Sequence, residues 1–382
     1  MKTVEYYMPT RVISGENSLS QIGSQAAGMG KKALLVTGKA AMRKLGITDR
    51  VIKYLKSEKI DVTLFDQVES NPKTEIVKKG AEIAKSEGCD LIIGVGGGST
   101  IDTCKGIAVV ATQGGDIEDY REERKIIKGP LLPILAVPTT SGTGSEVTPY
   151  SVFTSGKAKF AVRSPFTFPR VAILDPLLMT SQSPYLTACT GMDALTHAVE
   201  AFVSRSAQPI SDALAAQAIY LISRNLRKAV WTGDDIQARE NMAVASNLAG
   251  MAIAQAGAGA AHGLGMVVGG FFDTDHGTTV GLLLPYIMEY NLSARLEKYA
   301  QVAYLMGERV EALSLREAAL KAVNSVKNLI KDINLPSTLS EIGVRRESID
   351  EMAKETLKQG AMKKNPKVMQ IEDILELYQK CI

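Results

Sequence analysis

The sequence predicts an α/β domain followed by an all-helical domain, and three observations lead to this prediction. The length of 382 residues favours two domains. In the first half, short β-rich runs alternate with helical runs. In the second half the strand signals fade and helical patterns follow one another. We therefore expect the α/β domain over residues 1–180 and the helical domain over residues 181–382.

The strands of the first half are expected at near-continuous apolar runs. These runs cover residues 31–38, 61–66, 89–98, 133–140 and 171–176. Helical patterns separate the first four runs, over residues 40–58, 73–88 and 100–112. Strands that are apolar on both faces are typical of parallel sheets covered by helices on both sides. The pattern therefore predicts a doubly wound parallel sheet.

The second half is a succession of helical patterns divided by polar breaks. They cover residues 194–206, 211–230, 235–254, 293–306, 314–333 and 349–360. The stretch 242–272 carries no formally charged residue and is long enough to span a bilayer. Its many Gly and Ala residues, together with polar Asn247 and Gln255, favour tightly packed buried helices instead.

Composition narrows the function classes. The net charge is +3 and aromatic residues make up 5% of the chain, with no long basic run, so nothing indicates nucleic-acid binding. The 4 cysteines lack the spacing of a disulfide framework or a CxxC pair, which fits a reducing cytoplasm. The N-terminus MKTVEYYMPT lacks the apolar segment of a signal peptide.

All 3 histidines, His197, His262 and His276, lie between Gly191 and Gly277. Taken singly, each is more simply an ordinary core or surface residue. In GMDALTHAVEAF, however, Asp193 precedes His197 by one helical turn, so carboxylate and imidazole share a face. The segments around His262 and His276 are poor in charged residues, so either imidazole would be costly to bury without a partner. One carboxylate and three imidazoles favour a metal site, suited to Fe(II) or Zn(II).

Two loops indicate a nucleotide site. In DLIIGVGGGSTIDTCKGIA a strand, a glycine turn and a helix start follow one another, an arrangement whose free N–H groups favour a pyrophosphate. Ser99 stands where GxGxxG requires its last glycine, so a plain tight turn remains an alternative. A second loop, VPTTSGTGSEVTPY, follows the next strand, and its threonine hydroxyls either donate to phosphate or ribose or close a structural turn.

Several segments together resemble the iron-containing (group III) alcohol dehydrogenases. They are GMDALTHAVEAF, the stretch from His262 to His276, LLLPYIMEYN, GGGSTIDTCK and PTTSGTGSEVT. The resemblance extends over essentially the full length, from YYMPTRVISGENSL to the C-terminal helices. It implies a Rossmann-like domain plus a helical domain, the fold shared with dehydroquinate synthase. It also implies a metal held by the residues Asp193, His197, His262 and His276, with no catalytic residue beyond this site.

The resemblance also implies a dinucleotide site. Pyrophosphate would lie against Gly97, Gly98 and Ser99, and the phosphate and nicotinamide side against Thr139, Thr140 and Thr143. The remaining positions that match cofactor contacts of the family are Gly38, Asn71, Asp102 and Lys159. Lys159, which is otherwise a solvated surface lysine, is the weakest match of this set.

The coenzyme preference depends on Gly38. Members of the family that prefer NAD tend to carry Asp here, which accepts from the adenosine ribose and repels a 2′-phosphate. Gly38 is followed by Lys39 and Arg43, so the sequence favours NADP(H) over NAD(H), although basic residues at a helix start are also often only solvated.

Met266 departs from the family pattern. Many members carry a second histidine at this position, lining the substrate pocket and assisting proton transfer. With methionine, metal ligation is intact, and we expect protons to leave through water and the nicotinamide ribose. Plain core filling is the alternative role for Met266.

The function implied is a metal-dependent, NAD(P)-linked alcohol dehydrogenase or aldehyde reductase that forms a homodimer or a higher homo-oligomer. The alternatives on the same fold are a zinc-dependent polyol dehydrogenase and a cyclase resembling dehydroquinate synthase. The cyclase would need several Lys, Arg and His residues, and the region around His262 is too apolar for that. A nucleotide-binding protein without activity is a further alternative, which four intact ligand positions argue against.

Overall fold

The computed structural model describes residues 3–156 and 158–382. Its contacts divide the chain into two compact units. The α/β unit comprises Met8–Thr140 and Ser145–Met179, and the helical unit comprises Thr180–Ile382 with the N-terminal residues up to Tyr7 and the short segment Ser141–Gly144.

The α/β unit is built on a six-stranded sheet in the order β1-β8-β5-β4-β2-β3, in which every pairing is parallel. The strands are β1 Arg11–Ser14, β2 Lys32–Gly38, β3 Asp61–Val68, β4 Leu91–Gly96, β5 Ile134–Pro138 and β8 Val171–Leu174. The five apolar runs of the sequence are thus confirmed as strands. β1 was not predicted, because its residues are only partly buried and lie at the sheet edge.

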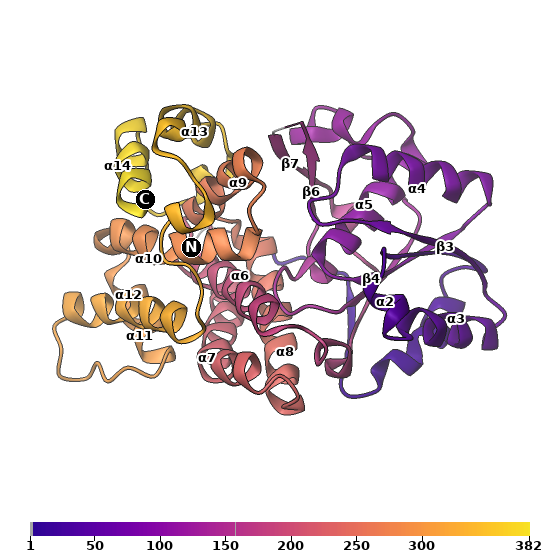
Figure 1. Ribbon diagram of the computed structural model, residues 1–382, viewed down its shortest axis with the longest axis horizontal. Coiled ribbons are helices and arrows are strands. Elements are labelled where there is room, and N and C mark those ends of the chain that lie inside the picture. Colours follow the sequence, from indigo (N-terminus) through magenta and orange to yellow (C-terminus); the bar gives the residue numbers. More distant parts are fainter. Residues whose placement is uncertain (1–2, 157) are drawn as a thin grey trace. The chain divides into compact units, whose positions relative to one another are not determined.

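Helices cover both faces of this sheet, as Figure 1 shows for α4 and α5 on one side and α2 and α3 on the other. They are α1 Ile22–Ala27, α2 Ala41–Lys44, α3 Ile47–Ser57, α4 Thr74–Ser86 and α5 Gly98–Gln113. Alternate residues of β2 serve the two faces: Leu34 packs in the core with α4 and α5, and Leu35 in the core with α1 and α3. The predicted doubly wound sheet is confirmed.

Two local features differ from the sequence prediction. The single helix expected over residues 40–58 is wrong, because Gly46 adopts φ +67° and separates α2 from α3. An antiparallel hairpin, β6 Tyr150–Ser155 with β7 Ala158–Arg163, was not predicted. Its strands are short and only partly alternate in burial, which leaves little pattern to recognise.

Among the described residues, the helical unit contains nine α-helices. They are α6 Pro184–Val203, α7 Pro209–Trp231, α8 Ile236–Ala256, α9 Ala260–Phe272, α10 His276–Asn291, α11 Leu296–Leu305, α12 Leu315–Asp332, α13 Ile349–Leu357 and α14 Ile371–Cys381. One core cluster joins α6, α7, α8, α11 and α12, and a second joins α9, α10, α13 and α14. The all-helical prediction is confirmed.

Within the described chain, no single helix is long and apolar enough to cross a bilayer. The helices α8 and α9 together pass such a test by length and composition, but they meet at an angle of 101°. The break begins at Gly257, whose φ of +75° suits glycine. Both helices are largely buried, as expected for the uncharged stretch 242–272.

Candidate metal centre

The helix α6 carries the first two candidate ligands. Its start is fixed by Ser183, whose hydroxyl accepts from the Leu186 N–H at 3.2 Å, and by Pro184 in the first turn. Asp193 and His197 lie one turn apart and are 2% and 9% exposed. Nε2 of His197 lies 3.9 Å from Oδ1 of Asp193. The helix therefore presents a buried carboxylate and an imidazole together.

Another helix of the site, α10, begins at His276 and approaches α6 very closely. A Cβ atom at Gly277 would lie 2.2 Å from the carbonyl oxygen of Cys189, so only glycine fits this contact. A hydrogen bond adds a second link, since the Tyr185 hydroxyl donates to the Asp275 carboxylate at 2.8 Å. The start of α10 is thereby held against α6, next to the first two ligands.

Oδ1 of Asp193 is the common neighbour of the three imidazoles. It lies 3.6 Å from Nε2 of His262, 3.7 Å from Nε2 of His276 and 3.9 Å from Nε2 of His197. Ligand atoms of Asp193, His262 and His276 all lie within 4.8 Å of one another. Two ligands about 2.1 Å from a tetrahedral ion are about 3.4 Å apart, so these separations fit atoms that share one ion.

The hydrogen bonding also fits a bound ion. Among the described residues, neither Oδ1 of Asp193 nor Nε2 of His262 has a hydrogen-bond partner, although both atoms are buried. Buried polar atoms without partners are costly and rare in native structures. The His197 and His262 rings stack with centroids 4.4 Å apart. A nitrogen-rich set with one carboxylate suits Fe(II) or Zn(II).

The surroundings of the cluster shift the pKa values of His197 and His262 in opposite directions. Burial opposes ionisation of Asp193, but the adjacent imidazoles outweigh it and hold the pKa of that carboxyl well below its usual range. Burial lowers the pKa of His197, despite the attraction of Asp193. For His262, burial is outweighed by the carboxylates of Glu200 and Asp193, which raise its pKa to about 10.

Glu200 is a residue of this site that sequence reasoning missed. It is 4% exposed and accepts a hydrogen bond from Nδ1 of His262 at 2.6 Å. Its signal was present in GMDALTHAVEAF, where it follows His197 by one helical turn on the buried side of α6. A buried glutamate in such a motif is expected to have a partner, but the sequence does not identify His262 as that partner.

Met266 lies on α9 one turn after His262 and is partly buried. Residues four apart on a helix share a face, so its thioether and the His262 imidazole leave α9 on the same side. This placement is compatible both with the pocket position that the resemblance implies and with core filling.

The glycine turn and the threonine loop lie side by side in the α/β unit. Gly97 caps α5, and Gly98 and Ser99 form its first turn. Thr139 and Thr140 follow β5, which pairs with β4. A Cβ atom at Gly97 would come within 3.3 Å of the Thr140 hydroxyl, so the two loops approach closely. Because β4 and β5 are parallel neighbours in the sheet, both loops lie at the same carboxyl edge.

Asp102, a predicted cofactor position, is engaged inside the protein. Its carboxylate accepts from Ser145 Oγ at 2.5 Å and from the Val152 N–H at 2.8 Å. Beside it, the fully buried Lys105 ammonium donates to Ser145 Oγ at 2.8 Å and to the Tyr150 carbonyl at 2.6 Å. Burial lowers the pKa of Lys105 to about 8. This network ties α5 to the segment that follows the threonine loop.

Two other predicted cofactor positions lie together: Lys159 Nζ donates to Asn71 Oδ1 at 2.8 Å. Asn71 adopts a left-handed backbone with φ +52°, a conformation that asparagine tolerates well. Thr143 lies elsewhere, in the segment Ser141–Gly144 of the helical unit. There the Cα of Gly250 would be 2.6 Å from a Cβ at Gly144, so this segment packs tightly on α8.

The basic residues near Gly38 are both paired with acids. Lys39 forms an ion pair with Glu69, and Arg43 forms one with Asp66 at 3.0 Å. Gly38 ends β2 and has room for a side chain, since a Cβ there would meet its nearest atom only at 3.6 Å. Exposed pairs of this kind contribute about 0–1 kcal/mol, so a competing phosphate can rearrange them.

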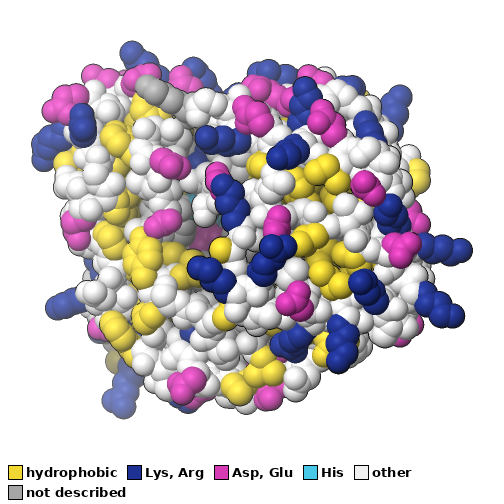
Figure 2. Space-filling view, turned by 45° about the vertical axis from the view of Figure 1, so that its right-hand side comes forward, with side chains coloured by type: hydrophobic (Ala, Val, Ile, Leu, Met, Phe, Trp, Pro, Cys, Tyr) yellow, Lys and Arg dark blue, Asp and Glu magenta, His cyan; other side chains and the backbone are white. Residues whose placement is uncertain are grey.

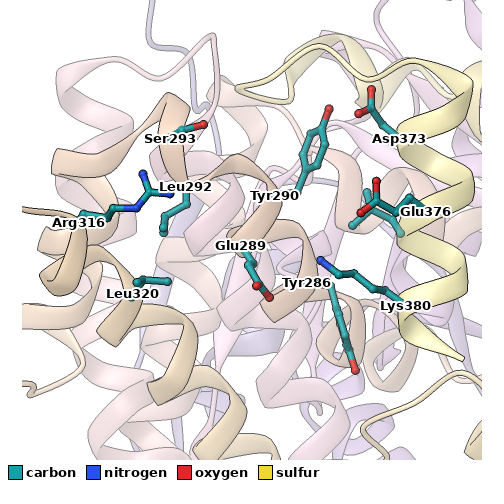
Figure 3. Close-up of a pocket in the computed structure, with 11 residues that line it drawn as sticks. Tyr286, Glu289, Tyr290, Leu292, Ser293, Arg316, Leu320, Asp373, Glu376 and Lys380 are labelled. Carbon is teal, nitrogen blue, oxygen red and sulfur yellow. The ribbon is translucent and has the colours of Figure 1, made fainter.

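A pocket of about 310 Å³ lies elsewhere in the helical unit, between α10, α12 and α14. Figure 3 shows Arg316 and Leu320 on one side of it and Glu376 and Lys380 on the other. Its lining contains none of the four candidate metal ligands.

On the face shown in Figure 2, charged side chains of both signs are interspersed, in keeping with the near-balanced charge of the chain.

Comparison with known proteins identifies the family. The model of the Fe-containing alcohol dehydrogenase family, C-terminal, matches residues 187–382, and the iron-containing alcohol dehydrogenase model matches residues 9–176. A 1,3-propanediol dehydrogenase of Klebsiella pneumoniae is 44% identical over 380 residues, 98% of each chain. An NAD-dependent methanol dehydrogenase of Bacillus methanolicus is 36% identical over 379 residues, 99% of each chain.

Solved structures agree with this assignment. The crystal structure of a 1,3-propanediol oxidoreductase superposes with a TM-score of 0.95 at 44% identity and covers 100% of both chains. An iron-containing alcohol dehydrogenase from Thermotoga maritima superposes with a TM-score of 0.88 at 36% identity over 99% of each chain. The chain therefore belongs to the iron-containing alcohol dehydrogenase family and is an NAD(P)-linked alcohol or aldehyde oxidoreductase.

Proposed function

We propose that Asp193, His197, His262 and His276 hold the catalytic metal ion, with Fe(II) as the native ion. The observation that carries this proposal is the position of Asp193 Oδ1, which lies within 3.9 Å of all three Nε2 atoms. When bound, the ion supplies Lewis acidity toward a substrate oxygen. Zn(II) competes for such sites, so metal supply decides occupancy. The protein contributes the fixed, buried geometry of the four side chains.

The pyrophosphate of the coenzyme is proposed to bind at the start of α5. Gly97, Gly98 and Ser99 leave free backbone N–H groups there, at the positive end of a 16-residue helix. The Thr140 hydroxyl beside Gly97 is available as a further donor. Thr139, Thr143, Asn71 and Lys159 are proposed as contacts to the rest of the coenzyme. Asp102 is proposed to act indirectly, because both its oxygens accept hydrogen bonds within the protein.

NADP(H) is proposed as the preferred coenzyme. Gly38 offers no carboxylate to repel a 2′-phosphate, and Lys39 and Arg43 provide positive charge nearby. Their ion pairs with Glu69 and Asp66 are the counter-argument, but those pairs are exposed and weak. The nicotinamide supplies the hydride that reduces an aldehyde, or accepts it from an alcohol.

The substrate is proposed to be a short aliphatic alcohol or its aldehyde. This rests on the 1,3-propanediol dehydrogenases, which are 44% identical over 98% of the chain. Met266 is proposed to line the substrate pocket, where it would make the lining more apolar than a histidine does. No protein side chain is required as nucleophile, and the exit of the proton through water and ribose remains part of the proposal.

The test is the rate of NADPH oxidation with 3-hydroxypropanal, and of NADP+ reduction with 1,3-propanediol, by protein purified without oxygen and loaded with Fe(II). Turnover that disappears on chelation, returns with Fe(II) and is slower with NADH is the expected result. Turnover that survives complete removal of the metal would contradict the metal assignment. Equal rates with the two coenzymes would contradict the coenzyme preference alone.

Self-association is also proposed, as homodimer or higher homo-oligomer. The helical unit exposes large apolar side chains, among them Trp231 at 60% and Tyr304 at 59%. Exposed apolar groups of this size are often interface residues. Light scattering coupled to gel filtration tests this directly, and a mass of 41.0 kDa at micromolar concentration would refute it.

A further inference from the structure

The Glu200 carboxylate is fully engaged by the first residues of α9. Oε1 accepts from the Ala261 N–H at 2.6 Å. Oε2 accepts from the Gly259 N–H at 2.9 Å and faces Nδ1 of His262 at 2.6 Å. All of these atoms are buried. One side chain of α6 thus caps α9 and holds the imidazole that α9 presents.

This arrangement decides which nitrogen of His262 carries hydrogen. An ionised carboxylate only accepts hydrogen bonds, so Nδ1 must be the donor. A histidine binds a metal ion as the neutral ring, whose lone pair is then on Nε2, the atom that lies 3.6 Å from Oδ1 of Asp193 and has no hydrogen-bond partner in the described structure. A histidine that binds metal through one nitrogen usually donates from the other to a carboxylate or carbonyl.

We propose that Glu200 is a positioning residue of the metal site, which fixes His262 with Nδ1 protonated and Nε2 directed at the ion. The inference rests on the proposed role of His262 as a ligand. Asp193, His197 and Glu200 are spaced one turn apart along the buried face of α6, so a single helix supplies two ligands and orients a third.

The fold makes room for this contact at Gly259. A Cβ atom there would lie 2.9 Å from Oε1 of Glu200, so a larger residue would push the carboxylate away. The positive end of α9 adds stabilisation for the buried negative charge, since α9 begins at Ala260. Two features of the sequence, a glutamate in α6 and a glycine before α9, are thereby explained by one contact.

The experiment compares Zn(II) affinity, measured by chelator competition, in the wild type, Glu200→Gln and Asn365→Ala. The glutamine has the same size but carries no charge, and its NH2 group cannot accept. One of the hydrogen bonds from Gly259, Ala261 and His262 to this side chain is therefore lost, together with the negative charge that favours a proton on Nδ1. Asn365 is the matched control, because its Oδ1 accepts from the Ala260 N–H at 3.4 Å at the same helix start, and among the described residues no hydrogen bond joins it to His262.

We expect Glu200→Gln to weaken Zn(II) binding by about 10- to 100-fold, the usual effect of removing such a partner. Asn365→Ala is expected to lose thermal stability but to stay within about twofold of the wild type in Zn(II) affinity. Unchanged affinity in Glu200→Gln, or an equal loss in both variants, would overturn the proposal and leave Glu200 as a helix cap only. Failure of the wild type to bind Zn(II) would refute the ligand assignment itself.

A second measurement needs no variant. With 3 histidines in the chain, nitrogen NMR of the Zn(II)-loaded protein labelled at histidine resolves the few ring systems. The expected spectrum has His262 with a protonated Nδ1 coupled to its ring protons. A protonated Nε2 on His262 would overturn the proposal even if Glu200→Gln failed to fold.

Discussion

Oδ1 of Asp193 lies 3.6 Å from Nε2 of His262, and within the described part of the chain neither atom has a hydrogen-bond partner. The separation is too long for a hydrogen bond and close to the spacing of two ligands on one ion. Because both groups are buried, the metal-free state leaves a carboxylate and an imidazole without full compensation. Metal binding and stability of the helical unit are therefore expected to be coupled.

The buried Lys105 predicts a dependence of stability on alkaline pH. Burial lowers its pKa from the usual 10.5 to about 8, so between these values the unfolded chain binds a proton that the folded chain does not. Stability from this group is therefore present above pH 10.5 and is lost as the pH falls through about 8. The shift corresponds to about 3 kcal/mol.

The measurement is the urea unfolding free energy of the wild type and Lys105→Met from pH 7 to pH 10.5. Over this pH range, the unfolding free energy of the wild type is expected to rise by about 3 kcal/mol relative to that of the variant. Tyrosines and other groups titrate in both proteins and cancel in the difference. A constant difference across the range would show that the pKa of Lys105 is not lowered.

Gly277→Ala is expected to disturb the metal site through packing. Its Cβ would lie 2.2 Å from the Cys189 carbonyl, so α10 must move away from α6 and take His276 with it. We expect a loss of about 1–3 kcal/mol in unfolding free energy, accompanied by weaker metal retention after dialysis. Gly360→Ala is the control, because a Cβ there meets nothing within 4 Å. Equal behaviour of the two variants would contradict the close approach of α6 and α10.

Met266→His is expected to add an ionising group near the candidate ligands. An imidazole with an ordinary pKa of about 6.5 should introduce a new ionisation into the pH profile of kcat, or change the preference among aldehydes. Met266→Leu conserves the apolar volume and should keep the wild-type profile. If the histidine variant retains both the pH profile and the substrate preference, Met266 is core filling.

Gly38→Asp tests the coenzyme preference. A carboxylate at this position accepts from a ribose hydroxyl and repels a 2′-phosphate, so the ratio of kcat/KM for NADPH to that for NADH should fall at least about tenfold, or about 1.4 kcal/mol. The nearest atom to a Cβ there is at 3.6 Å, so the change is sterically tolerated. Gly38→Asn, similar in size but uncharged, should change the ratio much less. An unchanged ratio in both variants would place the ribose elsewhere.

The sheet and most helices were predictable because their residues carry a strong local pattern. The runs that became β2, β4 and β5 are apolar on both faces, and α12 is strongly amphipathic. The edge strand β1 and the hairpin β6–β7 were not predicted, because short, half-exposed strands carry little periodicity.

At the site, the prediction of four candidate ligands rested on residue type and resemblance, and the structure brings the three imidazoles around Asp193. Glu200 was not predicted, because its role depends on where the start of α9 meets α6, a tertiary contact between Gly259 and Glu200 that no local pattern encodes. The pairing of Lys39 with Glu69 was missed for the same reason, since it joins the ends of β2 and β3.

The central claim is that Asp193 and the three histidines hold one metal ion. The most direct test is the metal content, by mass spectrometry after dialysis against metal-free buffer, of the Fe(II)-loaded wild type, Asp193→Asn and Thr196→Val. Thr196 is a buried neighbour on α6 whose hydroxyl donates to the Met192 carbonyl at 2.8 Å, so its variant controls for damage to the helix.

We predict about one ion per chain in the wild type and in Thr196→Val. For Asp193→Asn we predict almost no retained metal, because losing a ligand should weaken binding by more than about 100-fold, more than the loss of a residue that only supports a ligand. Retention of the ion by Asp193→Asn at the wild-type level would contradict the account.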